Sequence, residues 1–290
     1  MFNGSIVAIV TPFSDGKFDE KAYADLIEWH IKEGTNAIVP CGTTGESATL
    51  DYDEHLRVIE KCIEVVNKRV PVIAGTGANS TDETIMITRG AQKAGADGAL
   101  LVSPYYNKPS QEGIYRHYAK VAQVVDMPLV LYNVPGRTSS NVLPETVARL
   151  AEIDTIVAIK EATGNMRQVS DVIRLCGDKI VVLSGDDFTT FTLMSLGGKG
   201  VISVVANIVP GKVSEMCSYM HRGLIEDARK IHYELEPLSG AMFIETNPVP
   251  VKTSLAMMGK IREEFRLPLC EMSDANRDKL KGILSSNGLV

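Results

Sequence analysis

A lysine stands near the end of a short apolar segment in the middle of the chain. Residues 155–164 read TIVAIKEATG, so Lys160 follows a β-branched run typical of a strand buried on both faces of a parallel sheet. Folds of this kind place their chemistry at the carboxyl ends of the strands. Burial there disfavours the ammonium form and leaves a nucleophilic amine, which Schiff-base formation with a carbonyl requires. A lysine that leaves the sheet into solvent fits equally well, so other residues must decide.

A turn rich in glycine and threonine follows an earlier apolar run. Gly42 and Gly45 permit a tight turn with exposed backbone N–H groups, and Thr43 and Thr44 add two hydroxyls. These donors suit a small carboxylate. Turns of this composition also often only cap helices. Glu46, at the end of this turn, could then merely hydrogen-bond to the neighbouring backbone.

Two further polar residues follow the apolar run at residues 129–133. Tyr132 ends that run, where a phenol could act as a general acid or base beside Lys160. A core tyrosine with a satisfied hydroxyl is the usual alternative. Arg137 lies in the Pro-Gly turn that follows. It matters only if this turn folds over the strand ends, where its guanidinium could hold a carboxylate.

Several kinds of site are disfavoured by what the strand ends carry. All five histidines fall in helical stretches, so we expect no catalytic metal. No G-x-G-x-x-G follows a strand, which argues against a nicotinamide site. Residues 184–187, SGDD, bring acid to the expected site and disfavour a phosphate site there. We therefore expect neither a metal nor an organic cofactor.

Composition limits the remaining classes of protein. No apolar run approaches the ~18 residues of a membrane-spanning helix, and no secretory signal is evident at the N-terminus. Five dispersed cysteines without a CxxC pair indicate reduced thiols in a cytoplasmic protein. A net charge of −6 without a basic cluster argues against nucleic-acid binding.

Strand-like runs alternate with amphipathic stretches over most of the 290 residues. We expect eight strands, at residues 5–10, 37–40, 70–75, 98–103, 129–133, 156–161, 180–184 and 200–204. Helical patterns between them include residues 21–33, 52–67, 81–94, 111–125 and 144–152. Eight such units predict an α/β fold of the (β/α)8 TIM-barrel type, with an open doubly wound sheet as the weaker option.

The pattern changes to helices alone after residue 204. We expect helices at residues 210–222, 225–238, 248–258 and 274–284, with breaks at Pro237, Pro248, Pro250 and Pro268. The first of these completes the barrel. The prediction is therefore a catalytic barrel over residues 1–224 and a C-terminal helical extension over residues 225–290.

Three motifs taken together resemble the dihydrodipicolinate synthase family. They are GTTGE at residues 42–46, YNVPGRT at residues 132–138 and IKEATG at residues 159–164. The similarity runs from Gly4 through the C-terminal helices and includes SGDD at 184–187 and NPVPVK at 247–252. In this order the motifs are specific to the superfamily of pyruvate-dependent Schiff-base lyases.

The resemblance implies an enzyme that condenses pyruvate with L-aspartate 4-semialdehyde, the first committed step of diaminopimelate and L-lysine biosynthesis. The paired threonines and Arg137 favour this activity over N-acetylneuraminate lyase or a 2-keto-3-deoxy sugar-acid aldolase of the same superfamily. Two other classes compete. A barrel oxidoreductase would need a nicotinamide site, and a non-catalytic sensor of pyruvate-like acids would not need a buried amine.

The resemblance also implies a role for each matching residue. It assigns the imine to Lys160, proton transfer to Tyr132, Thr43 and a neighbouring subunit's Tyr106, the pyruvate carboxylate to Thr43 and Thr44, the second substrate's carboxylate to Arg137, and backbone lining of the pocket to Gly185 and Ile202. A role for Tyr106 across subunits implies a homotetramer built as a dimer of dimers.

An inhibitory L-lysine site is implied in part by the same resemblance. The matching residues are Ser47, Ala48, His55, Asn79, Glu83 and Tyr105. Two positions depart from the lysine-sensitive enzymes of the enteric type, because Tyr52 stands where those carry histidine and Asp51 where they carry asparagine. The set reads equally well as ordinary polar residues of a subunit interface.

Overall fold

Eight parallel strands form a closed barrel in the computed structural model, which describes residues 2–290. The hydrogen-bonded order is β4-β1-β10-β9-β8-β7-β6-β5, and a parallel bridge between Ile38 and Val72 joins the two end strands. The strands are β1 Gly4–Ala8, β4 Ala37–Val39, β5 Ile73–Gly75, β6 Gly98–Val102, β7 Leu129–Asn133, β8 Ile156–Glu161, β9 Val181–Ser184 and β10 Gly200–Ser203. The predicted TIM barrel is confirmed.

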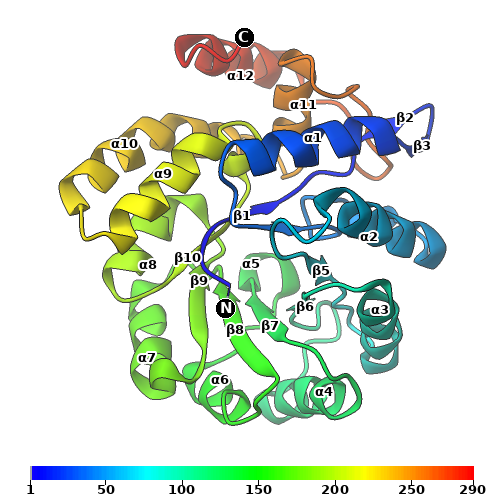
Figure 1. Ribbon diagram of the computed structural model, residues 1–290, viewed down its shortest axis with the longest axis vertical. Coiled ribbons are helices and arrows are strands. Elements are labelled where there is room, and N and C mark those ends of the chain that lie inside the picture. The colour runs from blue at the N-terminus through cyan, green and yellow to red at the C-terminus, as the bar shows by residue number, and fades with distance from the viewer. Residues whose placement is uncertain (1) are drawn as a thin grey trace.

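The helices surround this barrel in sequence order, with the C-terminal helices at one edge next to α1 (Figure 1). They are α1 Glu20–Lys32, α2 Tyr52–Val66, α3 Thr81–Ala94, α4 Gln111–Val124, α5 Pro135–Thr138, α6 Pro144–Leu150, α7 Met166–Cys176, α8 Thr190–Ser195, α9 Pro210–His221, α10 Ile225–Ala241, α11 Val249–Met257 and α12 Asp274–Ser286. Several start where the sequence predicts. Ser80 accepts from Glu83 N and Ser110 from Gly113 N, as N-cap residues do.

Alternation along each strand divides the core into an inner and an outer layer. Ala158 of β8 lies in a buried cluster inside the barrel, whereas Ile159 packs with the helices outside it. Because side chains of a strand alternate in direction, Lys160 points to the interior like Ala158. The strand pattern therefore decides the direction in which the lysine points.

The structure departs from the sequence-based expectation at Pro237. The break expected there is wrong, because α10 runs through Pro237 to Ala241. Proline removes the hydrogen bond to the carbonyl four residues earlier, here that of Tyr233. Both Pro237 and Tyr233 lie on the exposed side of the helix, where water can solvate that carbonyl.

A short hairpin, β2 Phe13–Ser14 and β3 Lys17–Phe18, is an addition that the sequence analysis did not include. Asp15 and Gly16 connect the strands with φ angles of 55° and 77°, the left-handed conformation that an Asp-Gly hairpin turn uses. The Asp-Gly dipeptide was the one sequence feature that indicated a hairpin. Strands of two residues are too short to show alternation of polar and apolar side chains.

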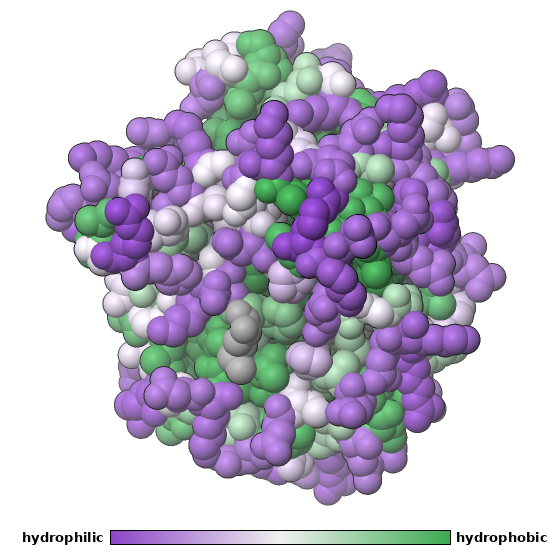
Figure 2. Space-filling view, viewed as in Figure 1, coloured by the Kyte–Doolittle hydropathy of each residue, from purple (hydrophilic) through white to green (hydrophobic). Residues whose placement is uncertain are grey.

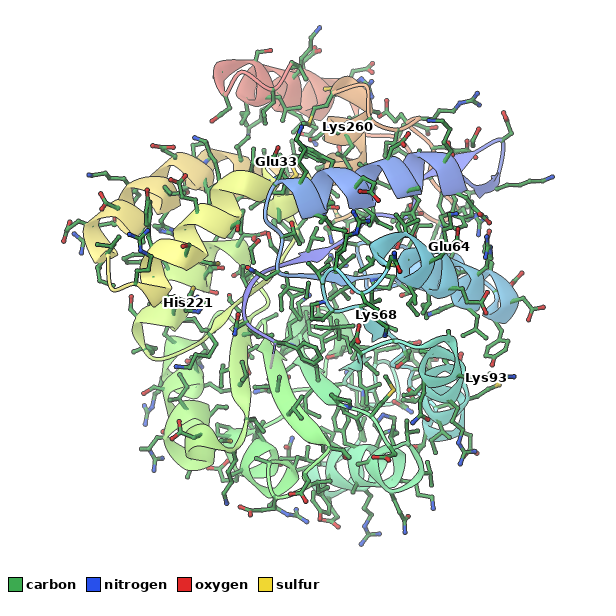
Figure 3. The ribbon with its side chains drawn as sticks, viewed as in Figure 1. Glu33, Glu64, Lys68, Lys93, His221 and Lys260 are labelled. Carbon is green, nitrogen blue, oxygen red and sulfur yellow. The ribbon has the colours of Figure 1, made fainter. Side chains whose placement is uncertain are left out.

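Hydrophilic residues cover the outer rim of the face shown in Figure 2, and hydrophobic residues appear toward its centre. Lys93 of α3, for example, extends away from the barrel (Figure 3). No helix within residues 2–290 is long and apolar enough to cross a membrane.

Candidate active site

Lys160 lies inside the barrel near the carboxyl end of β8. Its Cα pairs in register with Tyr132 of β7 on one side and Leu183 of β9 on the other. The side chain is 5% exposed, and Nζ lies 4.2 Å from the centroid of the Tyr132 ring. The alternative in which this lysine leaves the sheet into solvent is therefore wrong.

Gly185 leaves room for the aliphatic part of the Lys160 side chain. A Cβ at Gly185 would lie 3.0 Å from Lys160 Cγ, 3.1 Å from Lys160 Cε and 2.6 Å from Ala162 Cβ. Real Cβ atoms essentially never approach another atom as closely as the last of these distances. A glycine is thus required here for steric reasons, which adds to its expected part in lining the pocket.

The side chains predicted to do chemistry surround one cavity of about 270 Å³. We call it the site cavity, and it is lined by Thr43, Thr44, Tyr132, Val134, Arg137, Lys160, Ala162, Gly185, Asp186, Phe188, Val204, Phe243 and Asn247. Ile202 is buried within the barrel in the same apolar cluster as Tyr132. Tyr106 is 89% exposed, has a left-handed φ of 73° and does not line the site cavity of its own chain.

A buried ion pair connects the turn at residues 42–46 to the C-terminal helices. Glu46 has a left-handed φ of 54°, and its Oε1 accepts from Lys252 Nζ over 2.5 Å. Neither side chain is exposed. Burial lowers the pKa of Lys252, while the charge of Glu46 acts in the opposite direction. Glu46 therefore ties the threonine turn to α11 instead of serving only the neighbouring backbone.

A second buried carboxylate lies beside the site cavity. Asp187 accepts hydrogen bonds from Ser203 Oγ over 2.6 Å and from the backbone of Val204 and Val205 over 3.0 and 2.9 Å. Burial raises the pKa of Asp187, and those donors together with the charge of Lys160 oppose the increase. Burial also raises the pKa of Asp186, which lines the cavity itself.

Arg137 is placed over the strand ends by a contact with the segment before α11. Its Nη2 donates to the backbone oxygen of Asn247 over 3.2 Å, and Asn247 Nδ2 donates to Thr44 Oγ1 over 3.0 Å. The Pro-Gly turn forms α5, which follows β7 directly. The Pro-Gly turn therefore folds over the strand ends, which is the arrangement that binding of a carboxylate by Arg137 requires.

Comparison with known proteins agrees with this geometry. A model of the dihydrodipicolinate synthetase family matches residues 1–287. The chain belongs to this family. A 4-hydroxy-tetrahydrodipicolinate synthase from Thermodesulfovibrio yellowstonii is 70% identical, and one from Geotalea daltonii is 62% identical, each over 290 residues and 100% of both chains. The resemblance seen in the motifs is confirmed.

Solved structures of the dihydrodipicolinate synthase family share the whole fold. One crystal structure is 52% identical with a TM-score of 0.98 and covers 100% of both chains. The chloride-inhibited enzyme from Acinetobacter baumannii, complexed with pyruvate, is 48% identical with a TM-score of 0.98 and the same coverage. The enzyme from Cyanidioschyzon merolae with lysine bound is 38% identical with a TM-score of 0.97, covering 100% of this chain and 99% of that one.

A second, larger hollow of about 460 Å³ adjoins the site cavity. We call it the outer hollow. It shares Thr43, Val134, Arg137 and Asn247 with the site cavity, so these four residues separate the two spaces. Most of the residues that family resemblance assigns to lysine binding line it, namely Ser47, Ala48, His55, Glu83 and Tyr105. Asn79 lies next to it, where its backbone oxygen accepts from Asn107.

Two residues of the outer hollow have pKa values altered by their surroundings. His55 Nε2 lies 2.7 Å from the Gly75 oxygen, and burial lowers the pKa of its ring. Burial and the nearby charge of Glu83 raise the pKa of Tyr105. Tyr52, one of the two departures from the enteric type, also lines this hollow.

Sequence reasoning assigned no role to several residues of the site. Phe188 and Phe243, whose ring centroids are 6.4 Å apart, line the site cavity from η3 Asp187–Thr189 and from the segment just after α10. Asn247 begins the NPVPVK segment, which was matched to the family but given no function. Phe243 and Asn247 follow helix α10 and not a strand, so the rule that sites follow strand ends could not find them.

Proposed function

We propose that this chain is a lyase that condenses pyruvate with L-aspartate 4-semialdehyde to 4-hydroxy-tetrahydrodipicolinate through an imine on Lys160. The observation that carries the proposal is a buried Lys160 in one cavity with Tyr132, Thr43, Thr44 and Arg137. The names of the relatives and the pyruvate complex of the Acinetobacter baumannii enzyme support it.

The first half-reaction forms the imine. Lys160 Nζ attacks the keto carbon of pyruvate, and water leaves as the carbon–nitrogen double bond forms. Hydroxyl and backbone donors of Thr43 and Thr44 hold the pyruvate carboxylate. Tyr132 transfers the protons that this step requires, with Thr43 and the Tyr106 of a neighbouring subunit completing the relay. The imine then acidifies the adjacent methyl group, which loses a proton to give the enamine.

The second half-reaction joins the two substrates. The enamine carbon attacks the aldehyde of L-aspartate 4-semialdehyde while Arg137 holds that substrate's carboxylate. The amine of the same substrate then attacks the imine carbon. The ring closes and Lys160 leaves as a free amine, so one water is released over the whole reaction. Gly185 supplies backbone lining to the pocket, and the expected contribution of Ile202 would come from the barrel interior, where it is buried in the same cluster as Tyr132.

Borohydride reduction tests this function. Treatment of the enzyme with borohydride in the presence of pyruvate should inactivate it and add one reduced pyruvyl group to the peptide that contains Lys160. The matched control is Lys160→Arg, which keeps a charge but forms no imine. A label on another lysine would overturn the mechanism, and efficient cleavage of N-acetylneuraminate by the wild type would favour the sugar-acid lyases.

The proposal extends to assembly, regulation and location. The exposed Tyr106 supports a dimer of dimers in which it enters a neighbouring site. The outer hollow, together with the lysine-bound structure of the Cyanidioschyzon merolae enzyme, supports L-lysine as an inhibitor. Five free cysteines, four of them buried, support a cytoplasmic location.

A further inference from the structure

A second pair of side chains lies directly behind Lys160 and Tyr132, on the outer side of the same two strands. Asn133 of β7 pairs in register with Glu161 of β8, one position after Tyr132 and Lys160. Because successive side chains of a strand alternate in direction, these two point away from the barrel interior and toward the helices. Asn133 Nδ2 donates to Glu161 Oε2 over 3.1 Å, and the two residues are 0% and 1% exposed. A buried polar pair therefore joins the two strands at the level of the site.

Asn133 also holds the far end of the segment that carries Arg137. This segment, residues 134–142, contains α5 and leaves β7 directly after Asn133. Asn133 Oδ1 accepts from Val142 N over 3.0 Å, and its Nδ2 donates to Asn141 Oδ1 over 2.9 Å. One buried side chain thus joins the start of the segment to its end and closes it into a loop.

The end of this loop is also tied to two helices. Asn141 Nδ2 donates to Gln168 Oε1 of α7, and Gln168 Nε2 donates back to Asn141 Oδ1, each over 3.0 Å. Gln111 Nε2, at the start of α4, donates to the backbone oxygen of Asn141 over 2.7 Å. On the other side, Glu161 Oε1 accepts from Thr163 N over 2.9 Å. One network of side chains therefore connects the loop to β8, α4 and α7.

The guanidinium of Arg137 depends on this loop for its place over the site. Its Nη2 donates to the backbone oxygen of Asn247 over 3.2 Å. A hydrogen bond at the tip of a long side chain does not fix the backbone that carries it, because an arginine retains many rotamers. The closure of the loop by Asn133 supplies the constraint on the backbone.

We propose that Asn133 is a positioning residue, which places the Arg137 guanidinium at the carboxylate of L-aspartate 4-semialdehyde by closing the loop that carries it. The inference rests on the proposed function and extends it to a residue outside the site cavity. Pyruvate is held in that mechanism by Thr43 and Thr44, which follow a different strand. The effect of Asn133 therefore falls on the second substrate and spares the first.

Separate measurement of the two half-reactions in Asn133→Ala tests the proposal. The KM for L-aspartate 4-semialdehyde at saturating pyruvate should rise roughly 10- to 100-fold, since displacement of a positioning group by about 1 Å can have an effect of that size. The kcat should fall less than about threefold, because a contact made equally in the bound substrate and the transition state contributes to binding alone. Borohydride trapping of pyruvate on Lys160 should be nearly normal, which also shows that the variant folds. An unchanged KM, or equal damage to trapping, would overturn the proposal.

A double-mutant cycle with Arg137→Ala tests whether Asn133 acts through Arg137. Without the guanidinium there is nothing for the loop to place, so Asn133→Ala in that background should raise the KM by less than about twofold. Independent sites add their effects in free energy. If Asn133→Ala causes its full rise in KM in the Arg137→Ala background, the two residues act independently and the proposal is wrong.

The matched control is an asparagine at the opposite end of the barrel. Asn36 Oδ1 accepts from Ser5 N over 2.8 Å near the amino end of β1. Asn36→Ala should leave the KM for L-aspartate 4-semialdehyde and the trapping of pyruvate unchanged. A rise in KM as large as that of Asn133→Ala would overturn the proposal, because loss of any such asparagine contact would then have the same effect.

A milder variant keeps the test decisive if Asn133→Ala does not fold. Asn141→Ala retains the pair of Asn133 and Glu161 and removes the side-chain links from the loop end to Asn133 and α7. It should raise the same KM selectively, by a smaller factor. If Asn133→Ala does not fold, an unchanged KM in Asn141→Ala overturns the proposal. Trapping of pyruvate by the wild type tests the proposed function separately, so failure of one can be told from failure of the other.

Discussion

Lys160 and Tyr132 are direct partners across β7 and β8, and Lys160 Nζ lies 4.2 Å from the centroid of the tyrosine ring. Both side chains point inward from neighbouring strands at the same level, so the amine and the phenol open into one cavity. Register between two strands, and not a flexible loop, therefore fixes the distance between the proposed nucleophile and the proposed proton-transfer group.

Removing the phenol hydroxyl tests this arrangement. Tyr132→Phe keeps the ring that contacts Lys160 and removes the hydroxyl that we propose transfers protons. We expect turnover to decrease on the order of 10²- to 10⁴-fold, the range for a lost general acid or base, with little change in thermal stability. Steady-state kinetics and calorimetry give the two quantities. Near-normal turnover would make Tyr132 a packing residue only.

Arg137 distinguishes the two half-reactions. Arg137→Ala should weaken the binding of L-aspartate 4-semialdehyde by roughly 2 to 5 kcal/mol, because we propose that the guanidinium holds only that substrate's carboxylate. Imine formation with pyruvate, followed by borohydride trapping, should be nearly normal. Arg137→Lys keeps the charge without the planar fork and should be intermediate. Equal damage to both half-reactions would instead indicate a structural role.

The comparison of sequence and structure shows which features are predictable. Lys160 and Tyr132 lie near the carboxyl ends of their strands and the Thr43–Thr44 turn follows another strand, so alternation along the strands and barrel topology bring them together without further information. Asn247 and Lys252 reach the site from a segment more than 80 residues beyond Lys160 along the chain, and only tertiary packing decides where that segment lies. The division at residue 224 stays a prediction.

The buried pair of Glu46 and Lys252 should matter for stability. Lys252→Met leaves the Glu46 carboxylate buried without its cation, which costs about 3 to 5 kcal/mol of unfolding free energy. The double variant Glu46→Gln, Lys252→Met should recover much of that loss, because no lone charge remains. Urea unfolding measures both.

An exposed ion pair supplies the matched control. Lys212 and Glu234 are 2.6 Å apart with side chains about half exposed, so Lys212→Met should change the unfolding free energy by less than about 1 kcal/mol. A Lys252→Met variant as stable as this control would show that the buried pair is not needed. A double variant as unstable as Lys252→Met would show that Lys252 contributes through the contact of its Nζ with the Phe13 ring, which methionine lacks.

The burial of His30 leads to a prediction of how the stability of the fold changes in acid. Its ring is fully buried in α1, and burial, with a smaller effect from the charge of Lys260, lowers its pKa to about 3. The unfolded chain binds this proton near pH 6.5. Between those values the unfolded state holds more protons, so stability falls as the pH falls, by at most about 1.4 kcal/mol per pH unit.

Urea unfolding at pH 7 and pH 5 measures this contribution. The wild type should lose about 2 kcal/mol more than His30→Gln over that interval, since glutamine does not titrate. His221→Gln is the control, because His221 lies exposed at the end of α9 (Figure 3). The same pH dependence in His30→Gln as in the wild type would assign acid sensitivity to other groups.

Tyr106 leads to a prediction about assembly, because it is 89% exposed and does not line the cavity that contains Lys160 of its own chain. If its hydroxyl completes a neighbour's proton relay, each site takes Lys160 from one subunit and Tyr106 from the other. Lys160→Ala and Tyr106→Phe then remove residues that different subunits supply to the same site. Each variant alone should be inactive or nearly so. When the two are mixed under conditions of subunit exchange, a hybrid dimer has one site with both residues intact, and part of the activity should return.

Mixtures of either variant with itself control for refolding effects. If mass spectrometry of the native assemblies proves exchange and no activity returns, Tyr106 does not act across subunits.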